Sequence, residues 1–62
     1  MDEVLTDVEV ARHLRVSLAT VRRWRAEGTG PPWFRAGRAI RYSRRALNEW
    51  IERQERERER RE

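Results

Sequence analysis

The stretch that decides the fold is residues 6–28, TDVEVARHLRVSLATVRRWRAEG. It opens with a helix-start pattern, because the Thr6 hydroxyl can accept a hydrogen bond from the Glu9 N–H. The Glu9 carboxylate, three residues on, can accept one in return from the Thr6 N–H. Apolar residues then recur at helical spacing. The pattern predicts a first helix over residues 7–14.

The same stretch contains a second helix with its own start and stop. Ser17 is the next capping residue, and apolar residues at helical spacing follow it. Gly28 can end the helix, because glycine adopts a positive φ without steric penalty. We therefore predict a second helix over residues 18–27. Only a tight turn fits between the two helices, and this arrangement is a helix-turn-helix unit.

A β-hairpin is predicted after a Gly-Pro-Pro loop, with strands near residues 33–35 and 39–42. A two-residue loop would pair Phe34 with Arg41 and mix apolar and charged side chains on each face. A three-residue loop pairs Phe34 with Ile40 and places Arg35 and Arg41 on the other face. We prefer the three-residue loop, with Arg38 at its tip. In this register three apolar side chains share one face: Phe34, Ile40 and Tyr42.

The end of the chain predicts one further helix. Ser43 caps it, and its apolar face consists of Ala46, Leu47, Trp50 and Ile51. Residues 52–62 carry five Glu and five Arg, many of them four apart, a spacing that favours a helix. They contain no apolar seam, so a coiled coil is not expected. We predict a domain over residues 1–51 and a charged helical tail over 52–62.

Composition narrows the class of protein. The chain has 62 residues, no cysteine and one histidine, which argues against a disulfide framework, a cysteine zinc site or a histidine metal cluster. Its length allows one small domain. No apolar run approaches a membrane span, and the acidic residues near the N-terminus do not fit a signal peptide. We expect a cytoplasmic protein without catalytic activity, cofactor or metal.

The positive charge is concentrated in the middle of the chain. All 15 basic residues are arginine, and the net charge is +4. Residues 11–45 hold ten of these arginines against a single acidic residue, Glu27. Such a concentration is typical of a protein that binds a polyanion, although a solvated arginine-rich surface is the alternative.

The second helix has a face suited to duplex DNA. At about 100° per residue, Leu18, Val21 and Trp24 share the inward face. The outward face combines two small residues with two arginines: Ala19, Ala26, Arg22 and Arg23. Small residues allow close approach to a major groove, and an arginine fork can bind guanine or phosphate. Ser17 and Thr20 near the helix start can donate to phosphate.

The hairpin and the last helix add further basic candidates. Arg35, Arg38 and Arg41 lie on or near one ribbon, which can enter a minor groove. Arg44 lies at a helix start, where the dipole disfavours a cation, and this position suggests a phosphate partner. The predicted DNA-binding residues are Ser17, Ala19, Thr20, Arg22, Arg23, Arg35, Arg38, Arg41 and Arg44.

The order of motifs also resembles a known family. The segments LTDVEVARHLRVS (residues 5–17), TVRRW (20–24), GPP (30–32) and IRY (40–42) resemble the excisionase-type winged-helix family. That family is related to the DNA-binding domain of MerR regulators. The resemblance covers about residues 4–51. It implies a mainly α, winged helix-turn-helix fold with a two-stranded wing and a long C-terminal helix.

The resemblance further implies binding of double-stranded DNA, with the second helix in the major groove and the wing in the minor groove. Short members are often phage or plasmid excisionases, or recombination directionality factors. These bind repeated sites cooperatively, bend DNA, and help a tyrosine- or serine-type integrase to carry out excision. Such a protein would act in the bacterial host cell and be encoded by a phage or mobile element. Head-to-tail association could pair Asp2, Glu3 and Asp7 of one copy with the basic middle of the next.

Two other interpretations stay open. Short members of the same family also regulate transcription, so a small MerR-like regulator is the first alternative. The Glu/Arg tail allows a second alternative, a protein-interaction adaptor.

Overall fold

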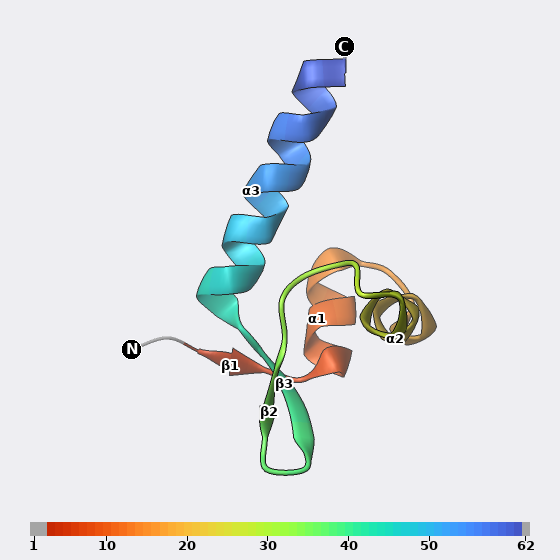
Figure 1. Cartoon of the computed structure of the whole chain (residues 1–62), viewed down its shortest axis with the longest axis vertical. Helices are drawn as coiled ribbons and strands as arrows, with labels where there is room; N and C mark the ends of the chain where they lie inside the picture. The colour runs from red at the N-terminus through yellow and green to blue at the C-terminus, as the bar shows by residue number, and fades with distance from the viewer. Residues whose placement is uncertain (1–2, 62) are drawn as a thin grey trace.

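The computed structural model describes residues 3–61. This part of the chain folds into three helices and a three-stranded antiparallel sheet of order β1-β3-β2 (Figure 1). The elements, in chain order, are β1 (Val4–Leu5), α1 (Asp7–Leu14), α2 (Leu18–Glu27), β2 (Phe34–Ala36), β3 (Ala39–Ser43) and α3 (Arg44–Arg61). The β2–β3 hairpin projects from one end of the body and α3 from the other. The mainly helical, winged helix-turn-helix fold is confirmed.

The caps explain why α1 and α2 have their predicted bounds. Thr6 Oγ1 accepts from the Glu9 N–H at 3.1 Å, and Glu9 Oε1 accepts from the Thr6 N–H at 2.9 Å, which completes the capping box. Ser17 Oγ accepts from the Thr20 N–H at 3.1 Å. Gly28 ends α2 with φ +75°. Both helices therefore begin and end as the sequence predicts.

The turn between α1 and α2 is made by Arg15, which adopts the left-handed conformation with φ 58°. Its N–H donates back to the carbonyls of Ala11 and Arg12. The Val16 N–H also donates to the Ala11 carbonyl, at 3.0 Å. These bonds satisfy carbonyls at the end of α1, so the chain can reverse within a few residues and begin α2.

The core is small and draws one or two residues from five elements. Its buried members are Leu5, Val10, Ala11, Val21, Tyr42 and Leu47. The ring centroids of Trp24 and Trp50 lie 5.7 Å apart, so this pair joins α2 to α3 at the edge of the core. Val21 and Trp24 thus pack inward as predicted.

The hairpin register differs from the preferred prediction. Three pairs join β2 to β3: Phe34 with Arg41, Arg35 with Ile40, and Ala36 with Ala39. Only Gly37 and Arg38 remain in the loop. Cross-strand partners share a face, so Phe34 shares its face with Arg41, and Arg35 shares the other with Ile40. The three-residue loop, the shared apolar face of Phe34, Ile40 and Tyr42, and the grouping of Arg35 with Arg41 are therefore wrong.

Turn geometry and exposure explain this register. Two-residue loops suit the twist of a hairpin, and one common type requires a positive φ at its first position. Gly37 occupies that position with φ +66°. Polarity segregates the faces of a strand only where one face is buried. All of β2 is exposed, and Phe34 keeps 42% of its surface in solvent. Burial therefore contributes little free energy that would favour a register with the apolar residues on one face.

The sheet contains a strand that the sequence does not predict. In β1, Val4 pairs with Ser43 and Leu5 with Tyr42, so the two-stranded wing is extended by a third, short strand. The Arg44 N–H continues this pairing by donating to the Glu3 carbonyl at 2.8 Å. Two residues are too few to show an alternating pattern, and the pairing partner lies far along the chain.

The last helix continues well beyond the body, as predicted (Figure 1). Ser43 Oγ accepts from the Ala46 N–H at 3.2 Å and caps the helix. Leu47 is fully buried, Trp50 and Ile51 are half-buried, and the side chains of residues 52–58 are exposed. Among residues 3–61, no helix combines the length and the apolar composition needed to cross a membrane.

Candidate nucleic-acid interface

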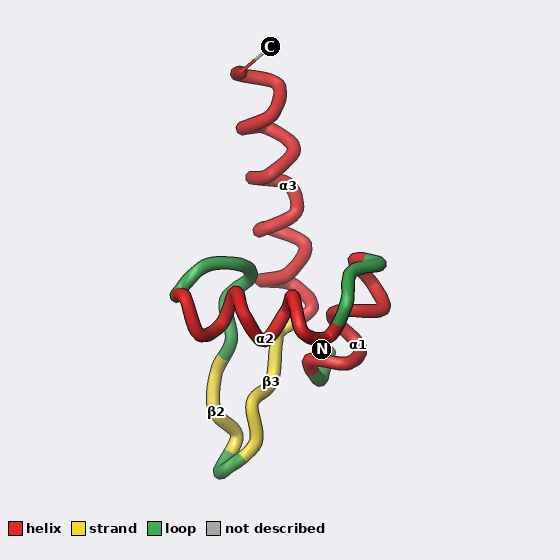
Figure 2. The backbone as a smooth tube through the Cα atoms, turned by 90° about the vertical axis from the view of Figure 1, so that its right-hand side faces the viewer, coloured by secondary structure: helices red, strands yellow, loops and turns green. Residues whose placement is uncertain are grey.

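The outward face of α2 is exposed as predicted. Ala19, Arg22, Arg23 and Ala26 all face solvent, whereas Val21 on the opposite side is 1% exposed. Figure 2 shows α2 lying across the molecule, with the β2–β3 hairpin projecting below it. Two small side chains therefore lie between two arginines on an open helix surface. Contact of these residues with DNA stays a prediction.

Ser17 and Thr20 form the N-terminal cap of α2. Their hydroxyl oxygens lie 2.8 Å apart, and Ser17 Oγ also accepts from the Thr20 N–H. In this cap, Ser17 Oγ acts as the hydrogen-bond acceptor. Their mutual hydrogen bond uses only one of the two hydroxyl hydrogens. The arrangement is compatible with the predicted phosphate contact.

The hairpin presents its arginines in three different directions. Arg38 is exposed in the loop at the tip. Arg35 and Arg41 lie on opposite faces, as the register requires. The Arg35 guanidinium lies 5.9 Å from the Trp33 ring centroid, within cation–π distance, and Arg41 Nη1 donates to the Ile40 carbonyl at 2.7 Å. A duplex held against one face of the wing would meet Arg38 and one of the other two arginines.

Comparison with known families agrees with this geometry. The family described as a helix-turn-helix domain matches residues 4–55. The chain belongs to this helix-turn-helix domain family. Such domains occur in excisionase-like and related DNA-binding proteins, so DNA is the partner class that the family supports. No curated protein and no solved structure matches the chain significantly.

Arg22 of this helix-turn-helix domain is held by α1. Its Nε donates to Asp7 Oδ2 at 3.2 Å, while its side chain is 57% exposed. Asp7 is the first residue of α1, and its side chain is only 18% exposed. The pair therefore joins the two helices of the motif at the edge of the face that is predicted to meet DNA.

Arg25 connects the same carboxylate to the core. Its Nη1 lies 3.6 Å from Asp7 Oδ2 and donates to the Tyr42 hydroxyl at 3.4 Å. Tyr42 is 1% exposed, and the Arg25 side chain is 21% exposed. A continuous set of polar contacts thus runs from β3 through α2 to the start of α1.

The surroundings of Asp7 favour its ionised form. Partial burial alone raises the pKa of its carboxyl. The hydrogen bond and charge of Arg22, the Val8 backbone N–H and the charge of Arg25 lower it by more, so the pKa lies below its ordinary value of 3.8. Asp7 is therefore a carboxylate at neutral pH and acts as a hydrogen-bond acceptor.

Sequence reasoning assigned no role in DNA binding to Asp7 or Arg25. The spacing of Arg22 and Arg25, three apart on one helix, indicates that they share a side. Their common partner is 15 residues before Arg22 in the chain, and no local pattern connects them. The contact follows from the packing of α1 against α2, which only the fold shows.

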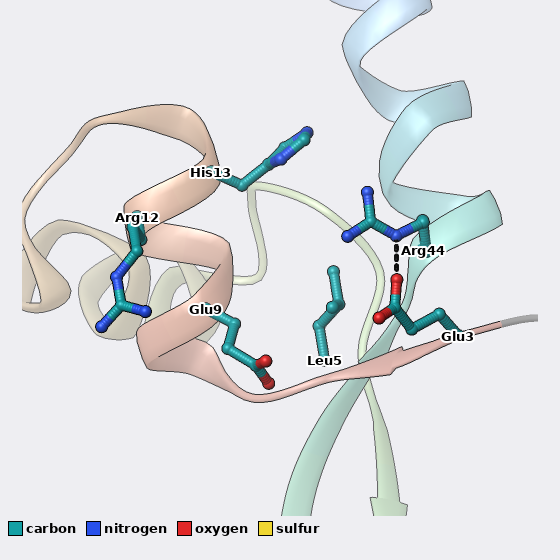
Figure 3. A pocket seen from close by; sticks show the side chains of 6 residues that line it. All are labelled: Glu3, Leu5, Glu9, Arg12, His13 and Arg44. Atoms are coloured by element: carbon teal, nitrogen blue, oxygen red, sulfur yellow. Dashed lines mark hydrogen bonds and ion pairs between the residues drawn. The ribbon is translucent and has the colours of Figure 1, made fainter.

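Arg44 lies away from the other predicted residues. Its Nε donates to the Glu3 carboxylate, and Figure 3 shows this pair across α1 from α2. The pair borders an open hollow of about 270 Å³ between α1, β1 and the start of α3. Glu3 supplies a counter-charge for a cation at this helix start, so no phosphate is needed to explain it. The phosphate contact of Arg44 stays a prediction that the geometry does not favour.

Proposed function

We propose that the chain is a sequence-specific architectural DNA-binding protein of the excisionase type. It binds repeated sites side by side, bends the duplex and directs an integrase toward excision. The observation that carries the proposal is the open face of α2, where Ala19 and Ala26 lie between Arg22 and Arg23. The basic hairpin projects below this helix (Figure 2).

The two elements suit the two grooves of a duplex. The face of α2 allows close approach of the helix backbone, and its arginines can bind base edges or phosphates in the major groove. In the hairpin, all of β2 is exposed and Arg38 lies at the exposed tip, an arrangement suited to entry into an adjacent minor groove. Simultaneous contact with both grooves favours a bent duplex, because bending brings more DNA surface against the protein.

Cooperation between copies would compensate for the small size of each domain. One domain makes few phosphate contacts, so its affinity for a single site is modest and falls steeply with salt. Neighbouring copies on repeated sites raise the effective concentration of one another. Glu3 and Asp7 already pair within the chain, so contacts between copies through these residues would have to compete with Arg44 and Arg22. Asp2, the third acidic residue proposed for this contact, lies outside the described residues.

The DNA-binding step is tested by selecting duplexes from a random library and titrating the selected site in a mobility-shift assay. Replacing Arg22 and Arg23 together by Ala should weaken binding by at least about tenfold, because each can contact a base edge or phosphate. The matched control replaces Arg53 and Arg56, two exposed tail arginines, and removes the same charge. Equal losses in both variants, or full affinity after the α2 changes, would contradict binding through α2. Full affinity of the Arg22/Arg23 variant would instead favour the interpretation as a protein-interaction adaptor.

The role in recombination is tested by an excision reaction with the cognate integrase and a supercoiled substrate. The protein should raise the yield of excised product, and the Arg22/Arg23 variant should not. If the protein has no effect on excision but changes the output of a nearby promoter, the excisionase role is wrong. The protein would then be a transcription regulator of the same fold.

A further inference from the structure

We propose that Asp7 of α1 is a positioning residue that holds Arg22 of α2 for recognition of a guanine, and so contributes to the sequence preference of the domain. The inference rests on the proposed DNA-binding function and adds a residue from outside the recognition helix. Its basis is the contact between the Asp7 carboxylate and Arg22 Nε at 3.2 Å.

The Asp7 carboxylate is itself held in place by a second arginine, Arg25. Asp7 Oδ2 lies 3.6 Å from Arg25 Nη1, and Arg25 Nη1 donates to the buried hydroxyl of Tyr42. Asp7 also begins α1, where the backbone N–H groups favour a negative charge. Its position is thereby tied to the sheet as well as to both helices of the motif.

The contact determines which atoms of Arg22 remain for DNA. A guanidinium has five N–H donors, and within the described part of the chain the bond to Asp7 occupies Nε. The two terminal nitrogens are the pair that can donate together to O6 and N7 of guanine. The Arg22 side chain is 57% exposed, so the terminal group can be reached from solvent. Because Asp7 already holds the Arg22 guanidinium, less conformational entropy is lost when this side chain binds DNA.

The charge of Asp7 acts in the opposite direction on binding without sequence preference. A carboxylate near the DNA-facing surface repels phosphates and offsets part of the Arg22 charge. Asp7 should therefore weaken binding to any duplex while strengthening the preference for the correct one. These opposite effects distinguish a positioning residue from one that merely stabilises the fold, since a less stable fold weakens binding to all duplexes alike.

The test compares Asp7→Asn with Glu9→Gln. Both remove one negative charge from the first turn of α1, and Gln at position 9 can still accept from the Thr6 N–H. Affinity is measured for the selected site, for sites with each base pair changed, and for random duplex. For Asp7→Asn, the discrimination at one guanine position should fall about fivefold to tenfold while affinity for random duplex rises. Glu9→Gln should keep the discrimination of the wild type.

A double-mutant comparison links Asp7 to Arg22. In the Arg22→Ala background, Asp7→Asn should cause no further loss of discrimination at that position, because its target is gone. Asp7→Glu keeps the charge but displaces the carboxylate, and serves if Asp7→Asn does not fold; it should show a partial loss at the same position. An unchanged discrimination profile in the folded Asp7 variants overturns the inference alone. Failure of the wild type to prefer any duplex overturns the proposed function and the inference with it.

Discussion

Arginines that look alike in the sequence have different surroundings in the folded chain. Arg22 bonds to Asp7 but stays largely exposed, Arg25 points toward the buried Tyr42, and Arg44 pairs with Glu3. Helical spacing predicts which of them face solvent. It does not predict their partners, because all three partners lie 15 or more residues away in the chain. The candidate site could therefore be predicted as a surface, whereas the contacts that orient its side chains could not.

A single glycine controls how the loop after α2 meets the core. Gly30 has φ +79°, and a Cβ at this position would lie 2.8 Å from the Cβ of Trp24. Gly30→Ala should therefore lower the free energy of unfolding by about 2 to 4 kcal/mol, from left-handed strain and displacement of Trp24. Urea unfolding followed by tryptophan fluorescence measures the loss.

The matched control is Gly28→Ala. Gly28 has a similar φ of +75°, but no atom lies within 4 Å of the added Cβ. Only the backbone strain of about 1 to 2 kcal/mol is expected there. Equal losses at the two positions would show that the contact with Trp24 contributes nothing.

Among the elements, those with a local start signal are the ones that the sequence predicts. Thr6, Ser17 and Ser43 each cap a helix, and each helix begins at the next residue. The hairpin strands are also predictable from alternation and the glycine, but their register is not. Every residue of β2 is exposed, so burial does not separate Phe34 from its charged neighbours. β1 is too short to have any pattern of its own.

The register has a consequence for the stability of the wing. Phe34 shares its face with Arg41 and is 42% exposed, so Phe34→Ala should cost less than about 1 kcal/mol of unfolding free energy. Leu47→Ala, in the fully buried core of α3, should cost about 2 to 5 kcal/mol. Thermal or urea unfolding of both variants measures the difference. A loss at Phe34 as large as that at Leu47 would instead support packing of Phe34 with Ile40 and Tyr42.

At the scale of the whole molecule, the structure separates a basic end from a neutral one. α2 and the hairpin lie toward one end, and α3 extends away from the hairpin (Figure 1). The five arginines and five glutamates of residues 52–62 cancel, so the net charge of +4 belongs to the rest of the chain. Charge counting along the sequence already predicts this division. The fold adds that Arg35 and Arg41 lie on opposite sides of the wing, so they do not face one duplex together.

This arrangement predicts how binding depends on salt. With Arg22 on a guanine, Arg23, Arg38 and one further wing arginine can face phosphates, which corresponds to about three phosphate contacts and a slope of roughly −3 for log K against log salt. Arg38→Ala, at the exposed tip, should flatten the slope by about 1. Deleting residues 52–62 removes no net charge and leaves the buried part of α3 in place, so the slope should not change. Fluorescence anisotropy at several salt concentrations measures all three slopes. A flatter slope after the deletion would mean that the tail reaches the DNA, and the basic surface would then extend beyond α2 and the wing.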